Sequence, residues 1–195
     1  MRHFVVVVVA AGLGGCPFLP DHELGDQGAP ERLIAFASDF EGYRSWPHVV
    51  VGTGPIEGGH NLDAPRTVFV NALPDDDALT WPVGTVIVKE GSGQEVEGGT
   101  GTQTHAMVKR GGNFNVDGAL GWEWFEIQSN GDAVVIVWRG EHPPDGEGYG
   151  CISGVCVPSS FGECNACHAG ARGNDFVSSS QLQLGRFDAS LLLPR

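Results

Sequence analysis

Short β-branched apolar runs alternate with glycine-rich turns along most of the chain. Gly 30 and Pro 12 together make up more than a fifth of the 195 residues, which favours short strands over a helical bundle. Asn130-Gly131 lies between the last two runs and predicts a hairpin, so those strands are expected to be antiparallel neighbours. The six strand-like runs are 49–51, 67–70, 85–88, 106–108, 122–127 and 133–138.

One stretch has helical rather than strand periodicity. Leu33, Phe36, Ala37 and Phe40 fall at i, i+3, i+4 and i+7, which predicts an amphipathic helix that Gly42 ends. No βαβ spacing is evident. We therefore predict an α+β fold: a mainly antiparallel β-sheet with an N-terminal helix and a loop-rich C-terminal segment after the last strand.

The charge balance excludes some classes of partner. The chain has 11 Lys plus Arg against 24 Asp plus Glu, a formal net charge of −13. Nucleic acids and anionic membrane surfaces are bound through Lys and Arg, so neither is an expected partner. A hydrophobic share of 41% and this length indicate one globular domain.

The N-terminus has the layout of an export signal. Arg2 precedes an apolar run over 4–13, which is shorter than the roughly 20 residues of a membrane-spanning helix. Leu13-Gly14-Gly15-Cys16 matches a bacterial lipobox, in which Cys16 receives the lipid; the alternative is a buried valine-rich strand with an incidental cysteine. We expect an exported protein, lipid-anchored to a bacterial membrane and facing the periplasm or cell surface. The predicted parts are a signal peptide (1–15), a tether (16–29) and the domain (30–195).

The segment Cys164-Asn165-Ala166-Cys167-His168 is a C-x-x-C-H sequence, the attachment signature of c-type haem. Two thiols add to the two vinyl groups of one porphyrin edge, and the adjacent histidine binds the iron. A thioredoxin-like redox pair would need a βαβ context. A zinc site would combine Cys164 and Cys167 with Cys151 and Cys156 at irregular spacing. We predict covalent haem c, with a local disulfide between Cys151 and Cys156.

The residue on the other side of the iron is not evident from the sequence. Met107 lies in a strand-like run and is interpreted as core. The remaining histidines are interpreted as surface or hydrogen-bonding residues, which favours an open sixth position for substrate or gas. These histidines are His22, His48, His60, His105 and His142.

Lys89 ends an apolar run, although the chain has only one other lysine, Lys109. With strand alternation, Lys89 shares a face with Thr85 and Ile87, while Glu90 shares the other face with the valines of this run. Taken alone, this position favours a lysine at the strand end that reaches solvent.

Several segments together resemble the cytochrome P-460 and cytochrome c′-beta family of bacterial haem proteins, over roughly Tyr43 to Phe176. The most specific combination is Gly-Thr-Val-Ile-Val-Lys-Glu (84–90) with the C-terminal C-x-x-C-H. The segments that carry the resemblance are 43–46, 66–71, 84–90, 121–125, 164–168 and 175–176.

The resemblance implies an antiparallel sheet around a haem c, often in a homodimer. It implies Cys164 and Cys167 as thioether anchors and His168 as the axial ligand. In P-460 cytochromes the lysine of the Val-Lys-Glu motif is joined to a porphyrin meso carbon, and Lys89 occupies that position. Lys89 is therefore expected to face the pocket, where burial would keep its amine neutral and nucleophilic.

P-460 members oxidise hydroxylamine, which makes this chain a candidate hydroxylamine-oxidising oxidoreductase with a small nitrogenous substrate. Members of the c′-beta kind bind nitric oxide instead, so a non-enzymatic gas-binding or electron-carrying protein is the alternative. The enzyme needs a pocket carboxylate to accept protons, and Glu126, Glu141 and Glu163 are candidates. An acidic surface suits a basic cytochrome as the electron acceptor.

Overall fold

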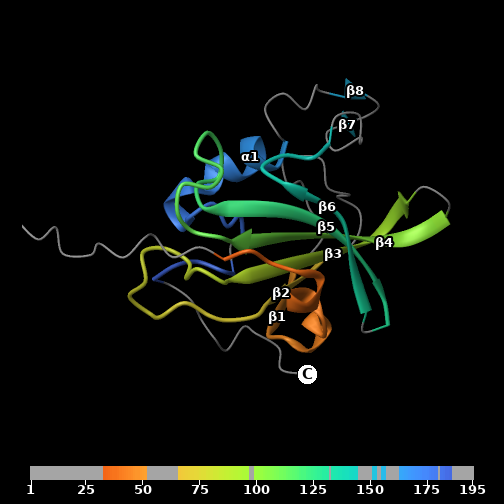
Figure 1. The fold of residues 1–195 in the computed structure, drawn as a ribbon, viewed down its shortest axis with the longest axis horizontal. Helices are drawn as coiled ribbons and strands as arrows, with labels where there is room; N and C mark the ends of the chain where they lie inside the picture. Colours follow the sequence, from red (N-terminus) through yellow and green to blue (C-terminus); the bar gives the residue numbers. More distant parts are fainter. Residues whose placement is uncertain are drawn as a thin grey trace, which may run out of the picture.

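A computed structural model describes residues 33–51, 66–96, 99–131, 133–144, 151–152, 155–156, 163–179 and 181–185. Its main element is a six-stranded antiparallel sheet in which the strands lie in chain order (Figure 1). The strands are β1 (His48–Val51), β2 (Arg66–Val70), β3 (Val86–Val96), β4 (Gly99–Lys109), β5 (Trp122–Asn130) and β6 (Ala133–Gly140).

The remaining elements are short. A two-stranded hairpin consists of β7 (Cys151–Ile152) and β8 (Val155–Cys156), and the C-x-x-C-H sequence lies on helix α1 (Glu163–His168). Three 3-10 helices complete the described part of the chain: η1 (Ala37–Phe40), η2 (Tyr43–Ser45) and η4 (Ala169–Asn174). The protein is thus mostly β, and the predicted antiparallel sheet is confirmed.

The predicted helix that starts at Leu33 is not present. Asp39 accepts a hydrogen bond from the backbone N–H of Phe36 at 2.7 Å, so the helical turn begins only at Ala37. Gly42, in the left-handed region at φ +68°, follows two residues after η1 ends. Four residues are too few for a stable α-helix, and the chain forms a 3-10 turn instead.

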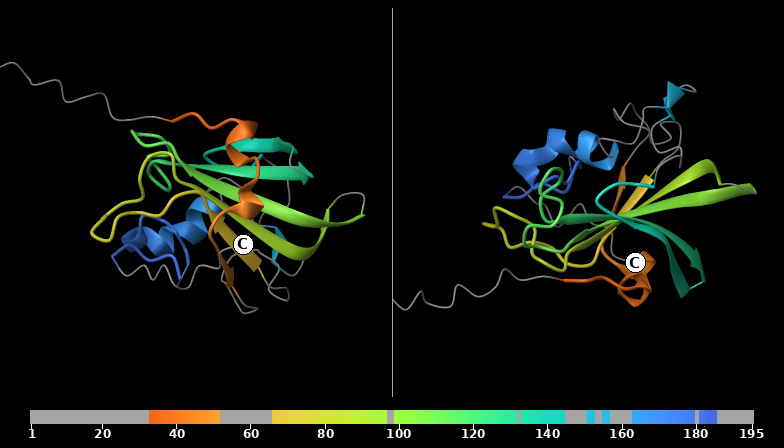
Figure 2. Two further views of the ribbon diagram at one scale, coloured as in Figure 1. Left: turned by 90° about the horizontal axis from the view of Figure 1, so that it is seen from below. Right: turned by 45° about the horizontal axis from the view of Figure 1, so that its top comes forward.

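The sheet has two buried faces with different coverings. Figure 2 shows α1 and η4 over one face and the orange 3-10 helices η1 and η2 over the other. Phe40 of η1 lies against Phe125, with ring centroids 5.1 Å apart, and Tyr43 of η2 lies against Phe69 at 5.3 Å. Successive residues of a strand point to opposite faces of the sheet. Because successive residues of β2 to β5 are apolar, these strands contribute buried side chains to both faces.

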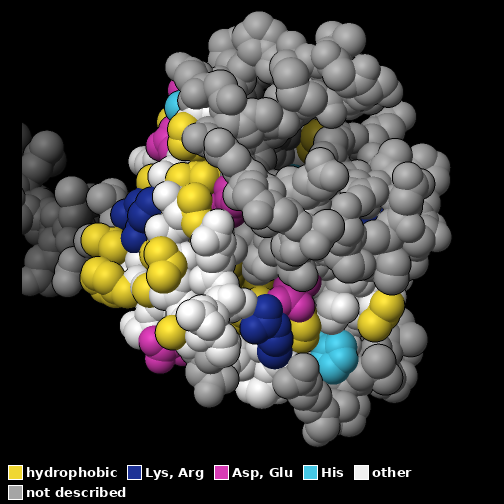
Figure 3. All heavy atoms as spheres, turned by 90° about the vertical axis from the view of Figure 1, so that its right-hand side faces the viewer, with side chains coloured by type: hydrophobic (Ala, Val, Ile, Leu, Met, Phe, Trp, Pro, Cys, Tyr) yellow, Lys and Arg dark blue, Asp and Glu magenta, His cyan; other side chains and the backbone are white. Residues whose placement is uncertain are grey.

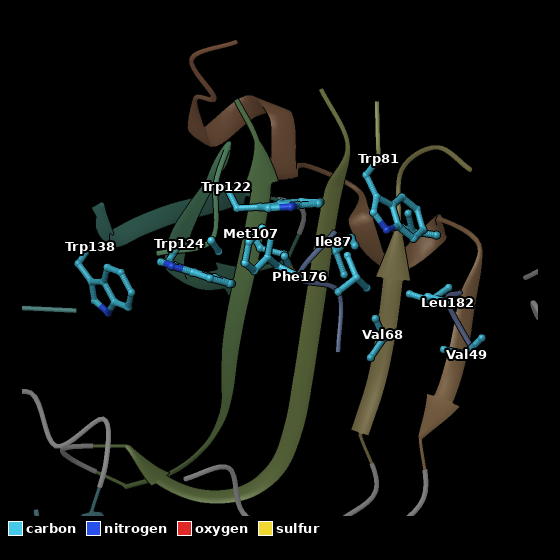
Figure 4. Packing of buried hydrophobic residues seen from close by; sticks show 13 residues of the cluster. Val49, Val68, Trp81, Ile87, Met107, Trp122, Trp124, Trp138, Phe176 and Leu182 are labelled. Atoms are coloured by element: carbon cyan, nitrogen blue, oxygen red, sulfur yellow. The ribbon is translucent and has the colours of Figure 1, made fainter. Parts of the chain in front are cut away.

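The face under α1 carries most of the tryptophans. Figure 4 shows Trp122, Trp124, Trp138, Met107 and Ile87 beside one another on this face, with Phe176 packed against them. We call it the tryptophan face. The residues of its buried cluster are Val49, Val68, Val70, Trp81, Ile87, Met107, Ala119, Trp122, Trp124, Trp138, Phe176, Val177 and Leu182.

Two hairpins determine the register. Asn130 pairs with Ala133, and Gly131 adopts φ +64°, a conformation that glycine reaches without strain, so the predicted hairpin is confirmed. The glycine-rich segment over 90–103, which we interpreted as a turn, instead continues both β3 and β4. Glycine lowers strand propensity, but a long hairpin ladder between two core strands offsets that cost.

Candidate functional site

A row of polar side chains crosses the tryptophan face of the sheet. Lys89 on β3 pairs with His105 on β4, His105 pairs with Glu126 on β5, and Glu126 pairs with Trp138 on β6. Directly opposed residues of antiparallel strands have their Cβ atoms about 4.5–5.5 Å apart, so each member is within reach of the next. The indole Nε1 of Trp138 donates a hydrogen bond to Glu126 Oε2 at 2.9 Å.

A bulge in β6 allows the row to end on a tryptophan. The register shifts between Glu126 and Ile127, which pair with Trp138 and Ile136. Val137 is the extra residue on β6 and is 48% exposed. The bulge moves Trp138 to the tryptophan face although Ile136 packs on the opposite face.

Helix α1 brings the C-x-x-C-H sequence to the same face. Cys164 packs against the tryptophan cluster, and the ring of His168 lies on Trp124 with centroids 4.6 Å apart. Lys89 also interacts electrostatically with the two cysteines and with His168. The structure therefore brings Cys164, Cys167 and His168 together with the polar row, although more than seventy residues separate Lys89 from the motif.

The imidazole of His168 is fixed through one of its nitrogens. Nδ1 lies 2.6 Å from the backbone carbonyl of Phe176, and because a carbonyl only accepts, Nδ1 carries the proton. Nε2 is therefore left with its lone pair. Burial lowers the pKa of His168 to about 4 against the opposing effect of that carbonyl, and Lys89 lowers it further. A neutral imidazole in one tautomer is the form that binds a metal.

The amine of Lys89 lies in an environment that disfavours its charge. Burial is the largest cause that lowers the pKa of Lys89 to about 7, and the Arg66 guanidinium lowers it further. Negative charge on Cys164 and Cys167 acts in the opposite direction. Lys89 is half-buried within β3 rather than placed at its end, unlike the solvent-reaching lysine that its strand position alone favoured. The pocket-facing role that the resemblance implies for Lys89 stays a prediction.

His105 belongs to the polar row, although the sequence did not indicate it as a site residue. It is half-buried between Lys89 and Glu126, and burial, followed by the charge of Lys89, lowers its pKa to about 3. Alternation along β4 could have assigned it to the face of Met107. Its pairing with Lys89 depends on where the β3–β4 hairpin turns, and the glycine-rich segment does not reveal that point.

Asn165, the first variable residue of the C-x-x-C-H motif, attaches α1 to the sheet. Its Oδ1 accepts hydrogen bonds from Trp124 Nε1 at 2.9 Å, Asn115 Nδ2 at 2.8 Å and Ala119 N at 3.1 Å. Its Nδ2 donates to Asn115 Oδ1 and to the Glu141 carbonyl, both at 3.0 Å. A Cβ on Gly118 would come within 2.2 Å of Asn165, so this contact requires glycine there.

Of the three candidate carboxylates, only Glu126 is found in the row, where it is 9% exposed. Glu141 follows β6 and is exposed, and its Oε1 accepts a 3.3 Å hydrogen bond from Asn115 N. The side chain of Glu163 lies outside the described residues, as do Cys16, His22 and His60.

The other predicted residues lie away from the row or in the core. Met107 is 5% exposed within the tryptophan cluster, in agreement with its interpretation as core. His48 is half-buried on β1, and His142 is exposed after β6. Cys151 and Cys156 are paired across the β7–β8 hairpin. Opposed Cα atoms of antiparallel strands are about 4.5–5.5 Å apart, a separation that a disulfide can bridge.

Comparisons with known proteins give no relatives: the chain matches no family model, no curated protein and no solved structure. Within the described residues, no three His, Cys, Asp or Glu side chains form a group that could hold a metal ion by themselves. The described helices are all too short or too polar to cross a membrane.

Proposed function

We propose that this chain is a haem c protein of cytochrome P-460 type that oxidises hydroxylamine. The observation that carries the proposal is the placement of Lys89, His105 and Glu126 in one row on the face that α1 covers with its C-x-x-C-H motif. Haem iron, when bound, would supply a redox centre that binds the substrate nitrogen and accepts electrons.

The residues present fit such a group. Cys164 and Cys167 both lie on one short helix, as two thioether anchors require. His168 offers Nε2 because its Nδ1 is held by the Phe176 carbonyl. The tryptophan face supplies an apolar surface around these donors, which suits a porphyrin and limits access of water.

Lys89 is proposed as the residue that joins the porphyrin. The new bond would replace a meso C–H bond of the porphyrin and release two protons and two electrons, which an external two-electron oxidant such as peroxide would accept. An amine attacks only when it is neutral, and a pKa of about 7 leaves much of Lys89 neutral at neutral pH. Formation of the thioethers would convert Cys164 and Cys167 into neutral sulfurs and remove their opposing effect on that pKa. Attachment at the cysteines would therefore favour the reactive form of Lys89.

Glu126 is proposed as the proton acceptor. It is buried, it lies two residues from Trp124 on the same strand, and Trp138 Nε1 holds one of its oxygens at 2.9 Å. A buried carboxylate at this place in the row is the type of group that receives a proton from a substrate in general base catalysis. His105 lies between Glu126 and Lys89 in the sheet register.

Mass and optical spectra of protein matured with the c-type haem machinery test the haem proposal. One haem added through two thioethers is expected, with a ferrous Soret band well to the red of ordinary haem c because a meso cross-link interrupts conjugation. Lys89→Arg keeps a cation without a reactive amine, so it should restore an ordinary spectrum and abolish hydroxylamine oxidation. Chains of apoprotein mass that bind stoichiometric zinc would contradict the proposal.

Turnover with an artificial acceptor tests the carboxylate. Glu126→Gln should lower hydroxylamine oxidation by about 10²–10⁴-fold, the usual contribution of a general base, while the thioethers remain intact. Glu141→Gln is the matched control and should leave turnover unchanged. Equal effects of the two substitutions would exclude Glu126 as the specific acceptor.

The apolar character of the tryptophan face favours one alternative, a protein that binds nitric oxide or carries electrons. Trp124, Met107 and Phe176 would surround a small uncharged ligand as well as a substrate. An ordinary haem c spectrum in the wild type, with tight nitric oxide binding and no hydroxylamine oxidation, would establish this alternative.

A further inference from the structure

The turn that follows η4 has a backbone conformation that ordinary residues rarely adopt. Asp175 and Phe176 lie at φ +49° and φ +66°, and neither is glycine. A left-handed conformation costs roughly 1–2 kcal/mol for a residue with a side chain, so the surrounding structure must hold these two residues in place. The carbonyl that fixes His168 belongs to the second of them.

Asp175 accepts hydrogen bonds from three parts of the sheet layer. Its Oδ1 accepts a hydrogen bond from Lys109 Nζ at 2.7 Å, and its Oδ2 accepts one from the backbone N–H of Trp81 at 2.9 Å. Its own carbonyl accepts a 2.7 Å bond from Trp122 Nε1. These contacts join the end of β4, the segment before β3 and the start of β5 to a single residue.

The ion pair between Lys109 and Asp175 is almost completely buried. Their side chains are 9% and 8% exposed, and Lys109 Nζ also donates to the Leu120 carbonyl at 3.2 Å. Burial of a charge is costly unless it is paired and hydrogen-bonded, and here both charges have several partners. Such a pair specifies one arrangement of the turn, because displacement of Asp175 would separate two buried charges that neutralise each other.

We propose that Asp175, anchored by Lys109, is a positioning residue that fixes the Phe176 carbonyl against His168 Nδ1. It thereby determines the tautomer, orientation and donor strength of the imidazole. The inference rests on the proposed function, since it concerns His168 as an iron ligand. A carbonyl that accepts from Nδ1–H increases the basicity of Nε2, which stabilises the oxidised metal and lowers its reduction potential.

The test uses the haem-loaded protein and the double variant Lys109→Met with Asp175→Asn. Asp175→Asn alone would leave the Lys109 charge buried without its partner, whereas the double variant removes both charges. The expected result is an unchanged haem mass with two thioethers, a reduction potential higher than that of the wild type, and solvent exchange of the His168 Nδ1 proton at least about ten times faster by NMR.

Glu123→Gln is the matched control. Glu123 is a buried carboxylate paired with Arg139 at 2.7 Å on the opposite face of the sheet, so its substitution should lower stability but leave the potential and the proton exchange unchanged. A double variant with wild-type potential and exchange rate would overturn this inference alone. A wild type that carries no haem would overturn the proposed function.

Discussion

Asn165 shows how a residue between the two cysteines of the C-x-x-C-H sequence can have a structural role of its own. Its amide contacts residues of the β4–β5 connection, β5 and the segment after β6 through five hydrogen bonds. The C-x-x-C-H signature leaves this position unspecified. In this chain it determines where the two thiols lie relative to the sheet.

Asn165→Ala should destabilise the protein by about 2–4 kcal/mol, because it leaves buried donors and acceptors of Asn115 and Trp124 unpaired. It should also lower the fraction of chains that carry haem. Denaturant unfolding and mass spectrometry measure the two effects. Ala166→Ser, at the neighbouring exposed position, is the control and should change neither. Equal effects of the two substitutions would contradict the docking role of Asn165.

His105 should make stability depend on pH in the acidic range. Its pKa is about 3 in the folded protein and about 6.5 when exposed, so the unfolded chain binds more protons between these values. Lowering the pH through this window therefore destabilises the folded state, by up to about 1.4 kcal/mol per pH unit.

His105→Gln removes the titrating group and should reduce this loss. The measurement is the free energy of unfolding of wild type and variant from pH 8 to pH 4. The reference is the difference in the free energy of unfolding between wild type and variant at pH 8, where residue 105 is uncharged in both proteins. Parallel stability curves over the whole range would contradict a buried neutral His105.

At the scale of elements, the 3-10 helices η1 and η2 complete the core on the face of the sheet opposite helix α1. The Tyr43 hydroxyl donates to Glu90 Oε1, and Arg44 Nε donates to the same oxygen at 2.8 Å. Glu90 is the neighbour of Lys89 in β3, so strand alternation sends one residue to each face. The packing of η1 and η2 thus supports the strand that carries Lys89.

Phe40→Ala should cost about 3–5 kcal/mol, the usual penalty for truncating a fully buried phenylalanine. Phe40 is 0% exposed, whereas Phe36, four residues earlier, is 64% exposed. Phe36→Ala is the matched control, with an expected change within about 0.5 kcal/mol. Thermal or denaturant unfolding checks both. A large effect of Phe36→Ala would mean that this segment packs in another way.

For the whole molecule, the relevant property is a formal net charge of −13. In Figure 3, the described Asp, Glu, Lys and Arg side chains of one face lie in small separate groups rather than in one large patch. With a net charge of this sign, the overall field would attract a basic partner.

Electron transfer from the reduced protein to a basic cytochrome c should consequently slow with added salt. We expect the second-order rate to fall by about tenfold or more between low ionic strength and about 0.3 M salt, because screening removes the long-range attraction. Stopped-flow absorbance measures it, and an acidic cytochrome serves as the control. A rate that does not change with salt would contradict electrostatic steering.

The strands and the hairpin at Gly131 could be predicted from the sequence because each depends on neighbouring residues. Alternation and β-branching identify a strand, and Asn-Gly between two strands identifies a hairpin. The role of the C-x-x-C-H sequence in haem attachment stays a prediction. The prediction of an N-terminal helix was wrong because periodicity does not reveal that Asp39 and Gly42 confine the helical turn η1 to four residues.

Only the tertiary structure decided which residues meet. The pairing of Lys89 with His105 and Glu126 depends on the register of two hairpins, and the shift of Trp138 to their face depends on a bulge. Asp175 meets Lys109 across 66 residues of sequence. Such contacts follow from the packing of whole elements. They cannot be predicted from local sequence, because a residue can be identified as one partner only when the position of the other partner is known.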